Sequence, residues 1–598
     1  MIIEGYKGYR EGQDILQIPS DYLTYPSKNC ITYKGKIISR LGLKNDGTAS
    51  TENTGVHSEY VWKKAPGGTK TLRVWGSSLQ VKLQGKWVTI FSGFATGTTR
   101  VRFCSWIDTN GTIIKSRLFM VDGGENIYEW SGAVAPIGSI AGAVVTINSE
   151  KTLLQLGFDP GNVTTRDVLI ARVDADYVPL GVETYEYTDT LAGNDDITLT
   201  STPSPTPDAN DWLIQGVITH TDQLTGVDKD EIYTYKNHLF TAELESGRIY
   251  YSHASDYLVF TIPGTGTAIT AGTLDLDGQF TAMIERKGVL WISTTDDWYK
   301  VTKAVEANAY GFFTEIEKFE QAESVGAKAF AVAIQKGDVV FMGADKRLRR
   351  IITLEVLGID DIELISDQID GLLDRLTLGD VRIYYHQRYI FIISADESVT
   401  LMLDIIEKEY MPPQYIGMSC MSIIDNVRYG HSNGRNETFE LFSGRDDLGG
   451  EIEVVVAPGF THGKQNFTPK KHDMFGMHAR ATATSTVALE YQYEEYGSNV
   501  SKQASFAVAD IRTYELPYDA SFGSNPLGRS TFAGVDDNPD SSLKGFFLFD
   551  RQEMVSWFDF RPVYTISGTD VEFHLMAWWI NEAQSDDNIP QELFINRS

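Results

Sequence analysis

One serine stands in a sequence pattern that serine hydrolases use. The stretch GHSNG, from Gly430 to Gly434, fits G-x-S-x-G, in which a strand leads into the nucleophilic serine and a helix follows it. The residues that come next, ETFELFSG, predict a strand and not a helix. We therefore expect Ser432 to lie in the turn of a hairpin, where it is not positioned as a nucleophile.

Carboxylates stand close together at three places and could in principle bind a cation or act as an acid and a base. The pairs are Asp275 and Asp277, Asp296 and Asp297, and Asp446 and Asp447. The first pair resembles part of a calcium loop, but Gln279 and Phe280 follow where further carboxylates are needed. The other two pairs are adjacent residues, whose side chains point to opposite faces of an extended segment. We expect all three pairs to belong to turns.

Metal, nucleotide and sugar-cleaving motifs are also missing from the sequence. His462, His472 and His478 are ten and six residues apart, without a second ligand at short spacing. GTGTAI, from Gly264, lacks the third glycine of a dinucleotide fingerprint, and the S-x-D-x-G-x-T-W turn of sialidase-type propellers does not occur. We predict no catalytic residues, no cofactor-binding residues and no metal site, so the protein is not expected to be an enzyme.

Composition favours a large protein built of strands. The chain has 598 residues, of which 42% are hydrophobic and 12% aromatic, with 53 glycines and 19 prolines. Aromatic residues favour strands, and glycine and proline favour turns. A chain of this length is expected to form several domains.

The formal net charge of −29 restricts the partners of the protein. Binding to phosphates requires lysine and arginine side chains that displace counterions. The charge therefore argues against a DNA-binding module and against an anionic membrane surface, and it is compatible with a wall to which DNA must not adhere.

Cysteine usage and hydropathy point to assembly in a reducing compartment. Cys30, Cys104 and Cys420 are far apart and odd in number, so no disulfide framework is expected. The N-terminus MIIEGYKGYREGQD has no apolar signal region. PIGSIAGAVVTI, from Pro136, is too short and too rich in glycine to span a bilayer, so no membrane-spanning segment is expected.

A two-strand pattern recurs along the chain. Each copy has a polar turn, an apolar strand, a turn of glycine, aspartate or serine, and a second strand that often ends in tyrosine or tryptophan. Seven copies start at Lys70, Lys115, Lys236, Arg286, Gln335, His386 and Asn426. Successive starts differ by 45, 121, 50, 49, 51 and 40 residues.

A strand repeat of about 40–50 residues is typical of a β-propeller, whose blades must stack in a ring because one blade cannot bury both of its faces. We predict an all-β fold containing a β-propeller of six or seven blades. The alternative is a run of unrelated hairpins in stacked sandwiches.

The predicted domains follow from this pattern. Residues 1–60 form an N-terminal arm with one hairpin, CITYKGKIISR, and residues 61–450 form the propeller. The 121-residue interval holds an inserted fibronectin-like β-sandwich at 155–225, which closes with a linker of serine, threonine and proline. Residues 451–598 form a C-terminal β-sandwich with long loops.

One helix is predicted in DDIELISDQIDGLLDRL, which covers residues 360–376. Its apolar residues recur at helical spacing: Ile365, Ile369, Leu372, Leu373 and Leu376. We expect this stripe to pack on the rim of the propeller, with contact to a neighbouring subunit as the alternative.

Three stretches resemble the propeller proteins of short-tailed bacteriophage tails, namely the tail nozzle, tail tubular and packaged-DNA stabilisation proteins. The first is GYREGQDILQIPSDYLTYPSKNCITYKGKIISRLGLK, from Gly8, with its hairpin and its Arg-x-Gly. The second is GRIYYSHASDYLVF, from Gly247, followed in the expected order by GQFTAMIERKGVLWISTTDDWYKVT. The third is RYGHSNGRNETFELFSGRDDLGGEIE, from Arg428, and then PKKHDMFGMHARATATSTVALEYQYE, which is similar to the start of their terminal sandwich.

This resemblance implies a structural virion protein located in the tail and assembled in the cytoplasm of the bacterial host. Six copies would form a ring-shaped nozzle below the portal and adaptor, with tail fibre or needle proteins as further partners. The ring would retain packaged DNA and let it pass during ejection, without sequence-specific binding and without a cofactor. It implies no catalytic residues.

Charge and loop composition suggest how such a channel would work. Six copies would carry 6 × −29 = −174 formal charges, and DNA would slide along a like-charged wall. The consecutive strand units of the chain are expected to close into a rigid, acidic ring whose hole lets nucleic acid pass without binding it, and a hole lined by arginine and lysine would contradict this expectation. For the gate of the channel we expect a flexible loop at 255–275, with these residues: Ser255, Pro263, Gly264, Gly266 and Gly272.

Two other functions remain open at this point. A receptor- or glycan-binding propeller at the tail tip would expose aromatic side chains on one face, and Trp291, Trp298 and Tyr299 are available for it. A glycosidase or lyase propeller would need converging carboxylates, which the sequence does not place.

Overall fold

We describe the fold from a computed structural model of the chain. The described residues are 6–12, 17–33, 36–46, 56–63, 65–95, 100–108, 115–158, 166–187, 195–221, 224–253, 257–260, 271–307, 310–319, 325–354, 359–394, 396, 398–431, 438–444, 446–460, 470–482, 486–495, 498–507, 543–549, 556–557, 559–567 and 573–583. Only the backbone is described for residues 33, 36, 56–57, 108, 115, 166, 302–307, 310–315, 359, 559–560, 562 and 573–583, and for the described residues between 470 and 557.

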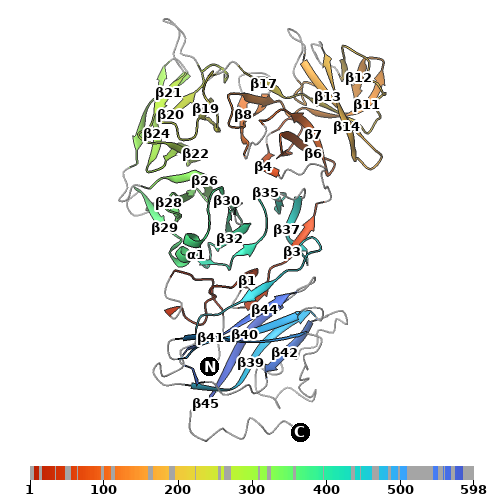
Figure 1. The fold of residues 1–598 in the computed structure, drawn as a ribbon. Helices are drawn as coiled ribbons and strands as arrows, with labels where there is room; N and C mark the ends of the chain where they lie inside the picture. Colours follow the sequence, from red (N-terminus) through yellow and green to blue (C-terminus); the bar gives the residue numbers. More distant parts are fainter. Residues whose placement is uncertain are drawn as a thin grey trace.

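Seven antiparallel sheets follow one another along the chain and form a ring, which is the propeller (Figure 1). Six of these blades have four strands, and the sixth along the chain has five. The innermost strands are β4 (Val56–Trp62), β8 (Arg102–Asp108), β18 (Glu231–Tyr235), β22 (Phe280–Arg286), β26 (Ala327–Gln335), β30 (Val381–His386) and β35 (Cys420–Ile424). Each innermost strand contacts the next, and β35 contacts β4, so the ring is closed.

The remaining strands of each blade lie progressively further from the axis. The second strands are β5 (Lys70–Trp75), β9 (Lys115–Val121), β19 (His238–Ala242), β23 (Val289–Thr294), β27 (Asp338–Gly343), β31 (Tyr389–Ser394) and β36 (Val427–His431). The third strands are β6 (Ser78–Leu83), β10 (Ile127–Trp130), β20 (Arg248–Tyr251), β24 (Trp298–Ala307), β28 (Leu348–Leu354), β32 (Val399–Asp404) and β37 (Thr438–Gly444). The outermost strands are β7 (Lys86–Ser92), β17 (Ile218–His220), β21 (Gly272–Asp275), β25 (Tyr310–Lys318), β29 (Ile359–Leu364), β33 (Glu409–Tyr410) with β34 (Gln414–Tyr415), and β3 (Gly42–Asn45).

The propeller prediction is confirmed, and the number of blades is seven. Each of the seven sequence copies supplies the second and third strands of one blade, for example β23 and β24 in the fourth. These strands repeat because they face neighbours on both sides and carry most of the buried apolar residues. The innermost and outermost strands follow no common pattern in the sequence.

An N-terminal strand closes the ring. β3 pairs with β37, so the seventh blade combines residues from the two ends of the propeller segment. The Arg-x-Gly of the N-terminal stretch makes this closure. Arg40 is fully buried, and its guanidinium binds both carboxylate oxygens of Asp447, with Nη1–Oδ1 at 2.7 Å. At Gly42 a Cβ atom would overlap the carbonyl oxygen of Asp446, so only glycine fits there.

The inserted domain lies between the third and fourth strands of the second blade. Its strands are β11 (Val134–Ala141), β12 (Val144–Ile147), β13 (Arg166–Val173), β14 (Pro179–Tyr187), β15 (Asp196–Thr198) and β16 (Trp212–Gln215). β11 pairs with β16 on one side and with β12 on the other, so two sheets share this strand and enclose a separate core. The strands of the domain run from Val134 to Gln215 and not over the predicted 155–225, because β11 follows β10 directly, without a linker of turn residues, and β17 already belongs to the second blade.

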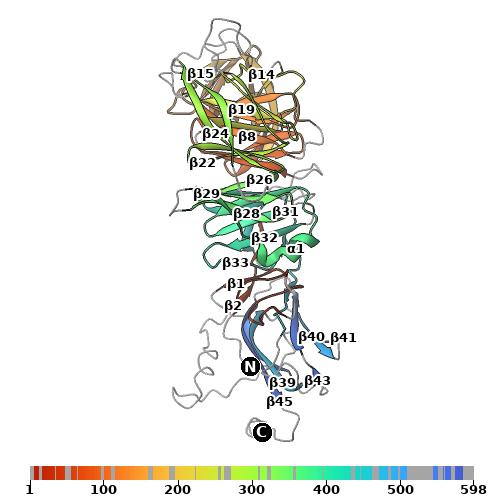
Figure 2. The ribbon, with the colours of Figure 1, turned by 90° about the vertical axis from the view of Figure 1, so that its left-hand side faces the viewer.

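The C-terminal domain is a β-sandwich, as predicted (Figure 2). One sheet contains β39 (Lys470–Thr482), β42 (Leu543–Phe549), β43 (Ser556–Trp557) and β45 (Phe573–Ala583), and the other contains β38 (Val454–Val456), β40 (Thr486–Glu495), β41 (Ser498–Ala507) and β44 (Asp559–Ser567).

The N-terminal segment belongs to this sandwich as well as to the propeller. Its predicted hairpin is present as β1 (Cys30–Tyr33) and β2 (Lys36–Ser39), and β2 extends the first sheet by pairing with β45. The backbone of Lys28 pairs with that of Val455 in the second sheet. The segment is therefore an integral part of both domains and not a separate arm.

The predicted helix is shorter than expected. Residues 359–364 form β29, and only the 3-10 turn Asp367–Ile369 and helix α1 (Asp370–Arg375) follow. The first half of the pattern is a strand because the fifth blade needs its outermost strand there. The apolar stripe does pack inward as predicted, with Leu372 and Leu373 buried in the largest core cluster.

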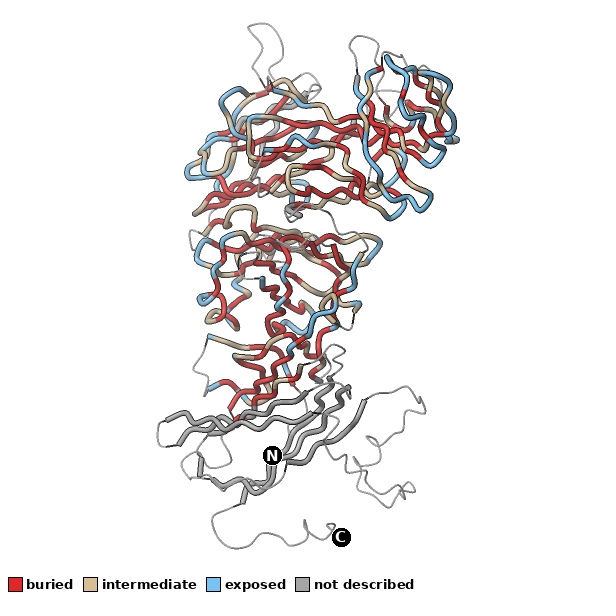
Figure 3. Tube along the Cα trace, turned by 45° about the vertical axis from the view of Figure 1, so that its right-hand side comes forward, coloured by how far each residue is buried: buried red, intermediate tan, exposed pale blue. Residues whose placement is uncertain are grey.

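Buried residues run along the blades and continue into the N-terminal segment (Figure 3). The largest core cluster joins blades five and six with residues of that segment and of the sandwich, including Tyr9, Cys30, Val454 and Tyr564. Propeller and sandwich thus share one apolar core. Among the described residues, no helix is long and apolar enough to cross a membrane.

Candidate functional site at the propeller axis

Charged side chains from several blades and one aromatic ring meet at one end of the ring of blades. We call this group the axial cluster, and it consists of Arg100, Arg102, Glu231, Phe330, Asp380 and Arg382. Each lies on an innermost strand or within two residues of its start. They come from the second, third, fifth and sixth blades, so they converge on the axis and not on one interface between neighbouring blades.

Ion pairs organise the axial cluster. Arg102 donates two hydrogen bonds to Glu231, of 2.8 and 2.7 Å, and Glu231 is buried. Arg382, also buried, donates to Asp380 from Nη2 at 2.9 Å. Arg100 approaches the same carboxylate at 3.6 Å from its Nη1. These pairs lower the pKa of Asp380, chiefly through the charges of Arg382 and Arg100, against the effect of burial.

A strained bulge brings an aromatic ring into the axial cluster. Between Ala327 and Val332 strand β26 carries extra residues relative to β27, and Phe330 within this bulge has φ +55°. This conformation is unfavourable for a bulky residue. Its ring lies under both Arg100 and Arg102, whose guanidinium carbons are each 5.0 Å from the ring centroid. The bulge therefore serves to direct Phe330 toward the axis.

These contacts close the hole of the propeller at this level. Arg100 of the second blade touches Phe330 of the fifth and faces Asp380 of the sixth, on the other side of the ring. A DNA duplex cannot pass where side chains of opposite blades touch. The hole is also lined by arginine. A DNA path through the hole of a single propeller, which the ring-shaped fold suggested, is therefore wrong.

A second buried polar network joins the first blade to the last. The Glu59 carboxylate on β4 contacts Nε2 of His431 on β36, and both side chains are fully buried. Nδ1 of His431 lies 3.1 Å from the hydroxyl of Thr438, which also accepts a 2.7 Å hydrogen bond from Arg73. The Arg73 guanidinium lies between two indole rings, 4.4 Å from Trp75 and 4.3 Å from Trp87.

Burial sets the charge states in this network. It raises the pKa of Glu59 to about 8, and it lowers the pKa of His431 well below its usual value, with Arg73 and Lys82 acting in the same direction. Both shifts favour the uncharged forms of the pair, a carboxylic acid and a neutral imidazole. The network extends from one end of the propeller segment to the other, which identifies it as part of the ring closure.

The strands that the predicted gate loop connects lie away from the axis. They are β20 and β21, the third and outermost strands of the third blade. Ser255, Pro263, Gly264 and Gly266 lie outside the described residues. Gly272 is the first residue of β21 and pairs with Tyr251, so it is part of a strand.

Described residues of the same loop pack between blades. The ring of Tyr257 lies 4.9 Å from Trp106 and 4.7 Å from Phe119, measured between ring centroids. Phe260 is buried in the same cluster between the second and third blades. These contacts fix one end of the loop between the second and third blades, against β8 and β9.

The other residues singled out in the sequence have structural roles. In GHSNG, β36 ends at His431 and β37 begins at Thr438, so a strand follows the serine as predicted, while Ser432 itself lies outside the described residues. Asp275 is the last residue of β21 and does not lie in a turn, so the prediction is wrong for this residue; its carboxylate pairs with Arg248 at 2.7 Å. Asp297 pairs with Lys318 at 2.6 Å.

The predicted turn roles hold for Asp297, which lies between β23 and β24, and for Asp446, whose carboxylate accepts the backbone N–H of Gly449 at 2.9 Å. Asp447 has the additional role of binding Arg40. His462 lies outside the described residues, and the side chains of His472 and His478 are not described. Within the described part of the chain, no group of three histidine, cysteine, aspartate or glutamate side chains could hold a metal ion.

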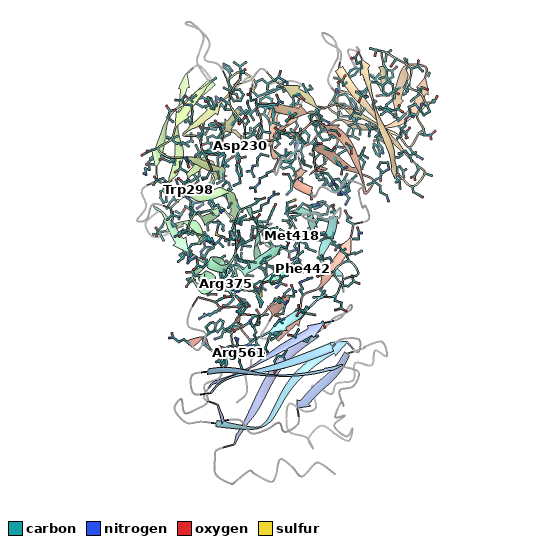
Figure 4. The ribbon with its side chains drawn as sticks, viewed as in Figure 1. Asp230, Trp298, Arg375, Met418, Phe442 and Arg561 are labelled. Atoms are coloured by element: carbon teal, nitrogen blue, oxygen red, sulfur yellow. The ribbon has the colours of Figure 1, made fainter. Side chains whose placement is uncertain are left out.

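The aromatic residues that a glycan-binding face would need are in the core. Trp291, Trp298 and Tyr299 are all buried, and Trp298, labelled in Figure 4, packs edge-on against Phe341 of the fifth blade. The expectation that they form an exposed binding face is wrong.

Sequence reasoning missed the axial cluster. Arg100 and Arg102 are two residues apart at the start of a strand, so they point to the same face, and this spacing was the available signal. Their partners on β18, β26 and β30 are distant in the sequence, and no local pattern connects them.

No protein-family model matches the sequence, and no curated protein is detectably similar to it. Among solved structures, Hsv2 of Kluyveromyces lactis aligns with a TM-score of 0.22 and 7% identity, over 60% of this chain and 97% of that chain. The Dos1 propeller aligns with a TM-score of 0.29 and 9% identity, over 68% of this chain and 95% of that chain. The propeller assignment itself rests on the strand topology given above.

Proposed function

We propose that the protein is a structural subunit of the tail of a short-tailed bacteriophage. Six copies would surround a channel that continues below the portal and adaptor, retains packaged DNA and lets it pass during ejection. The channel runs between the copies, and tail fibre or needle proteins attach to the ring. The role is structural and not catalytic, and assembly takes place in the cytoplasm of the bacterial host.

The observation that carries this proposal is the closed hole of the propeller. Contacts across the axis between the second, fifth and sixth blades close the hole of the propeller at one end. A propeller with a closed hole and a closed ring of strands is suited to be a wall element, because it is rigid and exposes few strand edges.

The joining of the two domains supports the same role. Residues of the N-terminal segment pair with the propeller through β3 and with the sandwich through β2. Arg561 of the sandwich donates to the hydroxyl of Thr24 at 2.9 Å in a buried position. Force applied to one domain during ejection would therefore be transmitted to the other without a flexible linker.

Charge supports passage of DNA without adhesion. Each copy carries a formal net charge of −29, and six carry 6 × −29 = −174. Repulsion from a wall of this sign extends over about 8 Å at physiological ionic strength. DNA would remain away from the wall and would slide.

Contact between copies requires uncharged surface, because like-charged subunits repel each other. The inserted domain offers such surface on the hairpin of β13 and β14, where four of the nine exposed large hydrophobic residues of the described chain gather: Tyr177, Val178, Leu180 and Val182. Clustered exposed apolar residues mark interaction sites, whereas scattered ones do not. The neighbouring copy is the occupant that the proposal assigns to this hairpin.

The proposal is tested by mixing the purified full-length protein with a portal and adaptor assembly of a short-tailed phage and imaging the particles by negative stain. The expected result is a hollow ring of this protein below the adaptor, and Leu180→Asp should reduce the number of rings while Leu41→Asp, at an exposed position of the N-terminal segment, should not. Fluorescence anisotropy with labelled duplex DNA should show no binding. Particles without an added ring, together with salt-dependent DNA binding, would refute the proposal.

A further inference from the structure

Arg100 is a nearly buried cation without a hydrogen-bond acceptor in the described part of the protein. Its side chain is 15% exposed. Its only polar neighbour at ion-pair distance there is Asp380, at 3.6 Å from Nη1, which is too long for a hydrogen bond. Its other contact is the face of Phe330. A buried guanidinium with five N–H donors is normally paired and hydrogen-bonded, because an unpaired buried charge is unfavourable.

The charges around Arg100 do not neutralise it. The axial cluster contains three arginines and two carboxylates. Glu231 is held by two hydrogen bonds from Arg102, and Asp380 by Arg382. Arg100 is the surplus cation. Burial, reinforced by Arg382 and Arg102, lowers the pKa of Arg100 to about 9, which agrees with an insufficiently compensated charge.

Phe330 leaves the donors of Arg100 available. A guanidinium stacked on an aromatic face keeps its N–H groups in its own plane, where they can bind an oxyanion with two parallel hydrogen bonds. The φ of +55° at Phe330 is unfavourable and persists only where surrounding contacts hold it in place. The contacts of its ring with the guanidiniums of Arg100 and Arg102 are of this kind.

We propose that the axial cluster is a binding site for a small oxyanion, a carboxylate or a phosphate group, with Arg100 as its main ligand. The anion would bind in the plane of the Arg100 guanidinium, supply the missing negative charge and bring the cluster to electrical neutrality. Arg102 and Arg382 act as positioning residues, because their own carboxylate partners hold them in place. The site does not depend on assembly into a ring, so it can exist whether or not the proposed tail function is correct.

The test is isothermal titration of the full-length protein with inorganic phosphate and, separately, with acetate, in chloride buffer at constant ionic strength. We expect saturable binding at one site per chain for at least one of the two anions, with a Kd on the order of 1 mM or tighter. The two titrations distinguish a phosphate site from a carboxylate site. No saturable binding of either anion in this range would overturn the proposal.

Two variants locate the site. Arg100→Gln should weaken binding by at least about tenfold, since hydrogen bonds from a charged donor are lost. The matched control is Arg248→Gln, at an exposed arginine paired with Asp275 on the outer part of the third blade, and its affinity should equal that of the unmodified protein. Equal affinity in Arg100→Gln and in the control would overturn the proposal.

Thermal unfolding provides a readout that a purely structural arginine would not give. The bound anion should raise Tm in the unmodified protein and in the Arg248→Gln control, but not in Arg100→Gln. In chloride without oxyanion, Arg100→Gln should melt at the same or a higher temperature than the unmodified protein. If Arg100→Gln lowers Tm relative to the unmodified protein by the same amount without oxyanion as in saturating oxyanion, Arg100 only supports packing, and the proposal fails. Should Arg100→Gln not fold, Arg100→Lys carries the same test, since it keeps the charge and loses the two parallel hydrogen bonds.

Discussion

Replacing Arg40 tests whether the N-terminal segment closes the propeller. Arg40 has no exposed surface, and its guanidinium binds Asp447 through both terminal nitrogens and Asn29 through Nε at 3.2 Å. Removing one partner of a buried ion pair costs about 3–5 kcal/mol. Because the side chain of Asp447 is 22% exposed and can regain water, we expect the lower end of this range for Arg40→Ala, about 3 kcal/mol.

The assay is hydrogen exchange, followed by mass spectrometry, on peptides that contain β3 and β37. Global unfolding would not report a simple free energy in a protein of several domains. A local loss of about 3 kcal/mol corresponds to about a hundredfold faster exchange through local opening. The change should be confined to the seventh blade and its neighbours, and the peptides of the fourth blade should exchange as before.

The matched control is Leu41→Ala, next to Arg40 and 52% exposed, where we expect a change of less than about 0.5 kcal/mol. Adding Asp447→Ala to Arg40→Ala should cost little more, because the pair is already broken. Unchanged exchange in β3 and β37 after Arg40→Ala, or an equal effect of Leu41→Ala, would refute this account of ring closure.

Three further perturbations test other parts of the structure. Gly42→Ala should accelerate exchange of β3 and β37 at least as much as Arg40→Ala, because its Cβ would overlap the carbonyl of Asp446; exchange as in the unmodified protein would contradict this. Burial raises the pKa of Glu59 to about 8, so the stability that its protonated form provides is greatest at low pH and is lost as the pH rises through 8. In the unmodified protein this loss of stability is at most about 1.4 kcal/mol per pH unit between pH 6 and 8, and Glu59→Gln should abolish it. An unchanged pH profile of Tm in Glu59→Gln would contradict this. Trp298→Ala, at a fully buried residue between the fourth and fifth blades, should cost about 3–5 kcal/mol of local stability, measured as at least about a hundredfold faster hydrogen exchange in peptides of β24 and β27, and a change of less than about fivefold would show that this contact is not part of the core.

The sequence allowed the propeller to be predicted because the second and third strands of every blade have the same neighbours. Each such pair, for example β27 and β28, is buried between two adjacent blades and repeats the same alternation. The innermost strands do not follow this pattern. β26 carries a bulge, and β8 begins with Arg102 and is preceded by Arg100, since both strands contribute side chains to the axis.

Closure of the ring could not be read from the sequence, because it joins residues about 400 positions apart. The Arg-x-Gly at residues 40–42 was visible as a motif, but its partner Asp447 was interpreted only as a turn residue. The boundary of the inserted domain was misplaced for a related reason. β11 pairs with β16, which lies about 70 residues further along the chain, and local composition does not predict this pairing.

Cryo-electron microscopy of the full-length protein, assembled with a portal and adaptor, tests the central claim most directly. The account predicts a closed ring of six copies in which the channel lies between the subunits, is wide enough for duplex DNA and is lined by aspartate and glutamate. A ring whose channel wall is formed by lysine and arginine, or a protein that remains monomeric beside the adaptor, would contradict it.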